Sequence, residues 1–171
     1  MNTLTDQARY VAHRRKELEM TQKDATKFFG LGKGSFGYYE SGMRTPPVLL
    51  LMLLAAYGRY PRLMKKSQEL ADYVYAPLVT PTYISYMRVK LALTKRDAAI
   101  LFGLGRAAFS QIESGDRDPP FTLMLLFNLI KHRPALLEEL RQLFPQKIGA
   151  RLPDKKSKPT KANRRIPTPT S

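Results

Sequence analysis

The chain has 171 residues and a formal net charge of +15, from 29 Lys and Arg against 14 Asp and Glu. Because it contains no cysteine, disulfides, zinc fingers and thiolate catalysis are excluded. Its 2 histidines are too few for a histidine-based metal cage, and we expect no metal and no cofactor. The excess of positive charge indicates a polyanionic partner and says nothing about the fold.

The longest uninterrupted apolar stretch covers only ten residues, Val48 to Tyr57. A membrane-spanning helix needs about 20 apolar residues, so we expect a buried helix in a soluble protein without a membrane partner. The first residues, MNTLTDQARY, contain no hydrophobic run resembling a signal peptide. We therefore expect a cytoplasmic location.

The chain contains one unit twice. Shifting the sequence by 73 residues aligns 8–70 with 81–143 without a gap, and 22 of the 63 aligned positions are identical. The most similar stretch reads FFGLGKGSFGYYESGMRTPP in the first copy and LFGLGRAAFSQIESGDRDPP in the second. Chance gives only a few identities over this length, so we predict two related domains, at 1–76 and 77–145.

Each copy is expected to contain about five short helices and no strand. Thr21 and Thr94 are typical N-cap residues, and the aspartate three positions later completes a capping-box-like pair. Gly30 and Gly103 are expected to end the second helix in the left-handed conformation. In the first copy, the first helix is expected at 6–19 and the third at 33–41, and the fourth and fifth begin after the prolines at 46–47 and 61. In the second copy, the third helix is expected at 106–114.

The second and third expected helices lie within about 20 residues and are joined by a turn that contains glycine. This is the layout of a helix-turn-helix, in which the second of the two helices fits the major groove of DNA. Phe36 and Tyr39 give the third helix of the first copy an apolar face, as Phe109 and Ile112 do in the second copy. We therefore predict an all-α fold of two tandem helix-turn-helix domains.

The opposite face of the third helix is the expected site of base recognition. Gln111 can form a bidentate contact with adenine, Arg106 can contact guanine or phosphate, and Ala107 can pack on a thymine methyl group. The first copy is the poorer reader, because Gly34 and Gly37 weaken its helix by about 1 kcal/mol each relative to alanine. The expected DNA-binding residues, of which those at the start of the second helix would hold phosphates, are Gln22, Lys23, Lys33, Gly34, Ser35, Tyr38, Lys95, Arg96, Arg106, Ala107, Ser110 and Gln111.

An enzyme is not expected. Gly32 to Gly37 match G-x-G-x-x-G, but a helix and not a strand precedes them, and the second copy loses two of the three glycines. No nucleophile, base and orienting group recur together in both copies. Glu40 and Glu113 recur with an arginine four positions later, and we expect each pair to close the turn after the third helix. Arg15 and Arg88 also recur and are either phosphate ligands or exposed side chains with other partners.

TQKDATKFFGLGKGSFGYYESGMRTPP and TKRDAAILFGLGRAAFSQIESGDRDPP resemble the lambda-repressor/Cro-like (XRE) helix-turn-helix family. The closer resemblance, over both copies and including KHRPALLEEL, is to the DNA-binding domain of MqsA-type antitoxins. The resemblance implies that the N-terminal part of the third helix reads bases and that a toxin is a second partner. At the positions where that subgroup has an Asn and an Arg, the first copy has Gly34 and Tyr38. The second copy has Ala107 and Gln111 there. The subgroup's cysteine-bound zinc domain, which serves the toxin, has no counterpart here.

The stretch from Val48 to Tyr57 is apolar on every face of a helix and must therefore be covered on every face. Its duplicate has Thr122 and Asn128 where the first copy has Leu49 and Ala55. We infer that Leu49 and Ala55 are covered by the other copy or by a second chain, which makes a homodimer through 48–57 one of the partners considered.

From Gln146 onward the chain carries eight Lys and Arg against one acid, with four prolines and no aromatic residue. Such a segment cannot bury enough apolar surface to offset its ordering entropy, so we expect 146–171 to be disordered. It is interpreted as a basic arm that contacts phosphate, with a solubility extension as the alternative.

These features predict a repressor that binds double-stranded DNA in the bacterial nucleoid. Two readers in one chain would occupy successive major grooves, about 34 Å apart, on an imperfect palindrome or on two unlike half-sites. The alternative is an antitoxin-like interaction module in which only the second copy binds DNA. The first copy would then mediate dimerisation or bind a partner.

Overall fold

The computed structural model describes residues 4–65, 67 and 81–144, and every regular element within these ranges is an α-helix. The first copy forms α1 (Leu4–Glu17), α2 (Gln22–Phe28), α3 (Ser35–Glu40) and α4 (Val48–Arg59), followed by helical residues at 61–65. The second copy forms α6 (Pro81–Lys90), α7 (Lys95–Leu101), α8 (Ala108–Ser114), α9 (Phe121–His132) and α10 (Ala135–Leu143). The predicted all-α class is confirmed. The predicted tail at 146–171 and the boundary between 76 and 77 lie outside the described residues.

The local signals at the ends of the second helix act as predicted. The Thr21 hydroxyl accepts a hydrogen bond from the backbone N–H of Asp24 at 3.1 Å, and Thr94 accepts one from Asp97 at 3.0 Å. Gly30 and its counterpart in the second copy follow these helices with φ of +61° and +64°. The chain therefore turns at the same point in both copies.

The third helix begins later than predicted in both copies, at Ser35 and Ala108. In the first copy Gly34 adopts φ +77°, which is a left-handed conformation that a helix cannot continue through. Lys33 therefore lies in a turn, which the hydrogen bond from Ser35 N to Gly32 O closes at 3.0 Å. The first helix also ends two residues early, at Glu17, and Glu19 beyond it has φ +54°.

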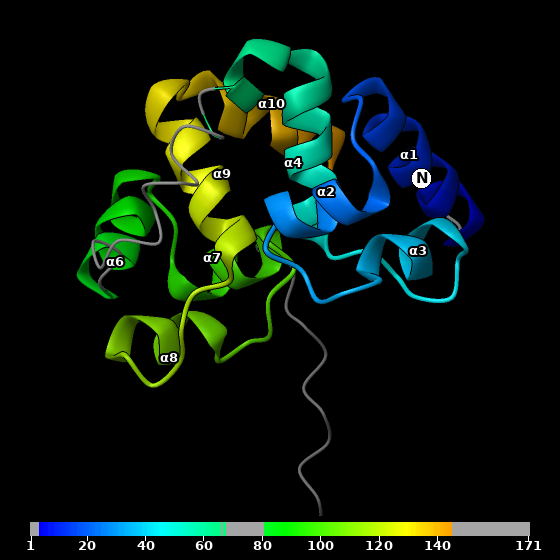
Figure 1. Ribbon diagram of the computed structural model, residues 1–171. Helices are drawn as coiled ribbons and strands as arrows, with labels where there is room; N and C mark the ends of the chain where they lie inside the picture. Colours follow the sequence, from blue (N-terminus) through cyan, green and yellow to red (C-terminus); the bar gives the residue numbers. More distant parts are fainter. Residues whose placement is uncertain (1–3, 66, 68–80, 145–171) are drawn as a thin grey trace, which may run out of the picture.

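The central pair of helices, α4 and α9, joins the two copies. In Figure 1 they stand side by side in the middle of the molecule, and α10 packs on both of them. Leu49 and Ala55 are only 2% and 6% exposed. The second copy therefore covers them, as the apolar faces of this helix predicted. Every residue from Leu49 to Tyr57 is buried within one chain, which disfavours the homodimer considered for 48–57.

The two copies are related by an approximate two-fold axis. A Cβ atom on Gly103 of the second copy would lie 2.7 Å from Val48 of the first. A Cβ atom on Gly30 of the first copy would lie 2.8 Å from Phe121 of the second, and Phe121 occupies the position equivalent to Val48. Reciprocal contacts between equivalent positions are the mark of a two-fold interface. The duplicated halves therefore pack like the subunits of a dimer.

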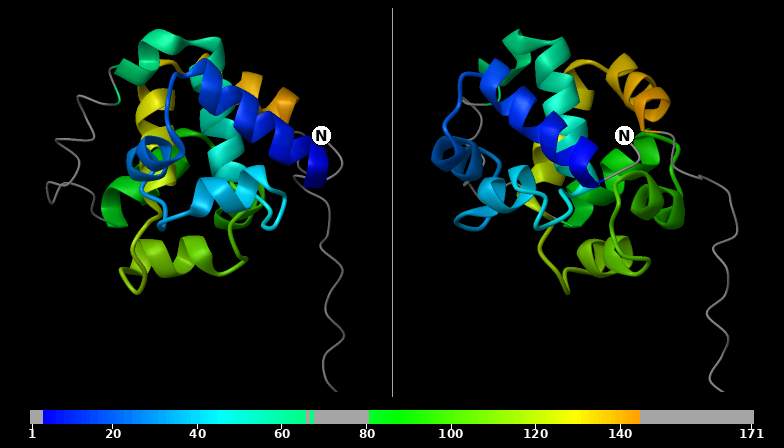
Figure 2. Two further views of the ribbon diagram at one scale, coloured as in Figure 1. Left: turned by 45° about the vertical axis from the view of Figure 1, so that its right-hand side comes forward. Right: turned by 90° about the vertical axis from the view of Figure 1, so that its right-hand side faces the viewer.

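The third helices α3 and α8 lie on the same side of the molecule. Each packs on the first and second helices of its own copy. The three views in Figures 1 and 2 place both of them on the lower side, away from α10. Within the described part of the chain, none of the helices has the length and hydropathy that crossing a membrane requires.

Candidate nucleic-acid interface

The third helix of the second copy exposes the residues that the sequence predicts as readers. Its inner face is buried, with Phe109 and Ile112 at 0% and 1% exposure. All four predicted readers of this copy are exposed, and they are Arg106, Ala107, Ser110 and Gln111. They combine a guanidinium, a methyl group, a hydroxyl and an amide, which are groups that can contact base edges and phosphates.

The corresponding surface of the first copy carries fewer functional groups. Lys33 and Gly34 are exposed in the turn before α3, and the Tyr38 side chain is 53% exposed. Ser35 is only 6% exposed, because the late start of the helix turns its first residue toward the core. The expectation that Ser35 reads DNA is therefore corrected.

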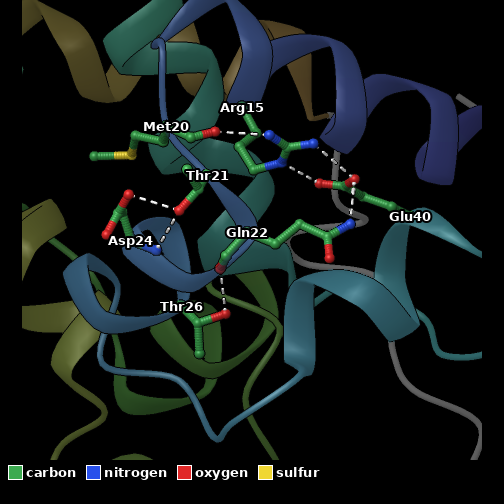
Figure 3. Close-up of polar contacts among 7 residues, drawn as sticks. All are labelled: Arg15, Met20, Thr21, Gln22, Asp24, Thr26 and Glu40. Atoms are coloured by element: carbon green, nitrogen blue, oxygen red, sulfur yellow. Dashed lines mark hydrogen bonds and ion pairs between the residues drawn. The ribbon is translucent and has the colours of Figure 1, made fainter.

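A partly buried carboxylate at the end of α3 joins the first three helices of the first copy. Glu40 accepts hydrogen bonds from Arg15 Nε at 2.5 Å and Arg15 Nη2 at 3.0 Å. The remaining Arg15 nitrogen, Nη1, donates to the Met20 carbonyl at 2.6 Å (Figure 3). Gln22 at the start of α2 donates to the second Glu40 oxygen at 2.9 Å. This network attaches the end of α3 to both α1 and α2.

The second copy repeats this network. Arg88 donates to Glu113 from Nε at 2.5 Å and from Nη2 at 3.2 Å, and Arg88 Nη1 donates to the Leu93 carbonyl at 2.8 Å. Lys95 occupies the place of the glutamine, with its Nζ 3.3 Å from Glu113 Oε2. Lys95 therefore forms an ion pair with Glu113 and is also exposed at the surface.

These contacts settle two open questions from the sequence. The side chains of Arg15 and Arg88 are only 12% and 14% exposed, so they are structural partners and not phosphate ligands. The glutamates pair with these arginines and not with the arginines four positions later. The expected pairing across the turn after the third helix is therefore wrong.

The two glutamates are held in the charged state. Burial opposes ionisation of Glu40, but the hydrogen bonds from Arg15 and Gln22 together with the Arg15 charge outweigh it, so its pKa is lowered. Burial likewise opposes ionisation of Glu113, and its contacts with Arg88 and Lys95 again lower the pKa below its usual value. Each carboxylate balances the charge of one arginine. The exposed lysines and arginines therefore determine the charge of the surface.

The other predicted residues at the start of the second helix are exposed, and they are Gln22, Lys23 and Arg96. Sequence reasoning missed Lys27, which is exposed one helical turn after Lys23 on α2. Its spacing from Lys23 was the available signal.

The comparisons with known proteins agree with this architecture. The family model for the antitoxin component of the bacterial toxin-antitoxin system MqsA matches residues 1–68 and, a second time, 59–141. The chain belongs to the MqsA antitoxin family. The two matches confirm the tandem duplication, and membership in a family of antitoxins confirms the expectation that the protein is not an enzyme.

A similar relative is the Antitoxin MqsA of Escherichia coli (strain K12). It is 46% identical over 69 residues, which are 40% of this chain and 52% of the relative. The chain thus matches about half the length of that protein. No solved structure shows a significant match.

Proposed function

We propose that this member of the MqsA antitoxin family binds double-stranded DNA and acts as a transcriptional repressor. The observation that supports this most directly is the exposure of Ser110 and Gln111 on α8 and of Arg106 in the turn just before it, at the end of a helix-turn-helix. A helix that presents such groups and is held rigidly from behind can enter the major groove.

The two-fold arrangement supports the use of both copies. Since α3 and α8 lie on the same side of the molecule and are related by the axis between the copies, they present their surfaces as the two halves of a dimeric regulator do. The two contacted half-sites of the operator are then in inverted and not in direct orientation. Its halves are unlike, because the two reader surfaces differ.

The experiment is footprinting on DNA next to the protein's own gene, followed by affinity measurements on the protected segment. Replacing both Arg106 and Gln111 by alanine should weaken operator binding by about tenfold or more, since a good bidentate contact to a base contributes roughly 1–3 kcal/mol. The matched control replaces Arg141 and Gln142 on α10, on the opposite side of the molecule, by alanine. It removes the same two side-chain types and should leave operator binding unchanged.

Two results would reject this function. One is the absence of any protected DNA segment together with no salt-sensitive binding to duplex DNA. The other is an equal loss of binding in the Arg106/Gln111 variant and the α10 control. Thermal unfolding of each variant confirms that the helices are intact.

A toxin is a second proposed partner, which family membership favours. The surface that would receive it does not include Leu49 to Tyr57 of α4, because these residues are buried within the chain. Co-purification with the toxin encoded beside this gene tests this proposal, and the α10 variant is again a suitable comparison. If the chain protects DNA but forms no complex with the toxin, the proposed toxin partner is rejected and the DNA-binding regulator remains.

A further inference from the structure

The first copy contains a cationic hollow beside its reader helix. It has a volume of about 520 Å³ and lies between α2 and the turn that leads to α3. Three lysines line it, Lys23, Lys27 and Lys33, and the remaining lining residues are Gln22, Thr26, Leu31 and Gly34. The hollow therefore joins the surface of α2 to the beginning of the reader surface.

The positive charge of this hollow is not compensated within the described part of the chain. No side-chain hydrogen bond or ion pair joins Lys23, Lys27 or Lys33 to another described residue. The acids on the same elements have other side-chain partners and form no ion pair with these lysines: Asp24 Oδ2 accepts a hydrogen bond from the Thr21 hydroxyl at 2.6 Å, and Glu40 is held by Arg15. Three ammonium groups around one opening favour an anionic occupant.

The second copy does not repeat this arrangement. The positions equivalent to Lys23, Lys27 and Lys33 hold Arg96, Ile100 and Arg106, so the middle cation is replaced by a partly buried apolar side chain. Lys95 of the same copy is paired with Glu113 at 3.3 Å. The unpaired lysine cluster is therefore a feature of the first copy.

The surfaces around the third helices also differ, but here the second copy carries more exposed functional groups than the first. Around α3, positions 32, 34 and 37 are glycines without side chains, and Ser35 is buried. Around α8, Arg106, Ser110 and Gln111 are all exposed. Lysine recognises phosphate as a point charge without regard to base, whereas arginine and glutamine can read base edges through two hydrogen bonds at once. The two copies thus offer different kinds of recognition.

From this asymmetry we propose that the copies divide the work. The lysine hollow of the first copy binds a backbone phosphate of DNA without reading sequence, and α8 of the second copy reads the bases. The inference rests on the proposed DNA-binding function. It adds that one half of the operator tolerates base changes while the other half does not.

The test measures the affinity of the full chain for the operator and for an unrelated duplex over a range of salt concentrations. The anchor variant is Lys27→Gln with Lys33→Gln, and the charge-matched control is Lys65→Gln with Lys131→Gln, two exposed lysines outside the hollow. The anchor variant should weaken binding to both duplexes by the same factor. It should also reduce the slope of log K against log salt by about 1, because one phosphate contact contributes about 0.9.

The reader variant Gln111→Ala should behave in the opposite way. It should lower affinity for the operator by about tenfold, leave affinity for the unrelated duplex unchanged, and keep the salt slope, since it removes no charge. Systematic base changes in the operator should then affect one half-site much more than the other.

Three outcomes would overturn the division of labour. The anchor variant could change the ratio of operator to unrelated binding, which would make Lys27 and Lys33 readers. It could match the control variant, which would remove the hollow from the interface. A mononucleotide could bind the hollow as tightly as duplex DNA does, which would make it a site for small anions. Failure of the proposed function is distinct, because then the unmodified chain binds neither duplex.

Discussion

Arg133 stacks on Tyr60, the residue at the equivalent position of the other copy. Its guanidinium carbon lies 4.0 Å from the centre of the tyrosine ring, and its Nη2 donates to the Tyr60 hydroxyl oxygen at 2.7 Å. Both side chains also bind Glu139, which accepts from the Tyr60 hydroxyl at 2.7 Å and from Arg133 at 3.1 Å. Equivalent residues that touch lie close to the two-fold axis. Two identical copies would place two arginines or two tyrosines there, so the unlike pair favours contact between the first copy and the second.

This pair leads to a stability prediction. Tyr60→Phe keeps the ring for stacking but removes the hydroxyl, and it should lower the free energy of unfolding by about 1–2 kcal/mol, because a hydrogen bond to a charged partner is lost. Chemical denaturation measures the effect, and Tyr86→Phe, at a position that is 58% exposed, is the control. A double-mutant cycle with Arg133→Ala should show coupling of at least about 0.5 kcal/mol. Strict additivity would contradict the contact.

The close approach at Gly103 should make this position intolerant of a side chain. Gly103→Ala combines a left-handed backbone with a Cβ atom 2.7 Å from Val48, and we expect a loss of about 2–4 kcal/mol. Gly42→Ala isolates the backbone term, because Gly42 has φ +73° and nothing lies within 4 Å of its Cβ position. It should cost only about 1 kcal/mol. Equal losses in the two variants would mean that the copies do not meet as described.

Acid should weaken the protein through Glu40 and Glu113, its two partly buried glutamates paired with arginine. The pKa values of Glu40 and Glu113 are lower in the folded chain than in the unfolded chain, so the unfolded state binds protons more readily. The stability that these carboxylates contribute is fully present above the unfolded pKa of about 4.3 and is lost as the pH falls through their folded pKa. Unfolding measured at neutral pH and again below about pH 4 should show the loss. The double variant Glu40→Gln with Glu113→Gln should show a smaller difference between the two conditions.

The arginine partners of these glutamates should act on folding and not on DNA contact. Arg88→Lys cannot keep both hydrogen bonds to Glu113 and the bond to the Leu93 carbonyl, so we expect a loss of about 2 kcal/mol in stability. At a temperature where the variant remains folded, the salt slope of its DNA binding should equal that of the unmodified protein. A slope reduced by about 1 would identify Arg88 as a phosphate ligand after all.

Relief of backbone strain gives a change in the stabilising direction. Ala92 has φ +52°, which costs an L residue roughly 1 kcal/mol or more. Ala92→Gly should therefore raise the unfolding free energy by a few tenths to about 1 kcal/mol, once the greater chain entropy of glycine is subtracted. Ala12→Gly inside α1 is the control and should lower it by about 1 kcal/mol. Equal effects in both variants would contradict the left-handed conformation at Ala92.

The features that the sequence predicts well are those that act over a few residues. Thr21 bonds to Asp24, and Gly30 turns the chain, because the relevant atoms are neighbours along the backbone. The start of the third helix was misplaced because Gly34 breaks the helix, whereas the apolar pattern around it continues. The partner of Glu40 was missed for a related reason: an arginine stands four positions away, but the one that binds it, Arg15, comes from a different helix.

The relation between the two copies could not be predicted from the repeat alone. A duplicated sequence is compatible with stacking by translation as well as with a two-fold axis, and only the packing decides. The apolar faces of α4 did indicate that something covers Leu49 and Ala55, but they left the second copy and a second chain as equal alternatives. The DNA-contacting roles of Arg106 and Gln111 remain predictions, because exposure alone permits such contacts without demonstrating them.

The covalent link between the two halves affects how the molecule responds to dilution. A regulator assembled from separate subunits loses its paired arrangement when its concentration falls below the dissociation constant of the dimer. Here both halves belong to one polypeptide, so each keeps the other at a high effective concentration however few molecules a cell contains. Occupancy of a target should consequently rise with the first power of protein concentration, without the threshold that dimerisation imposes.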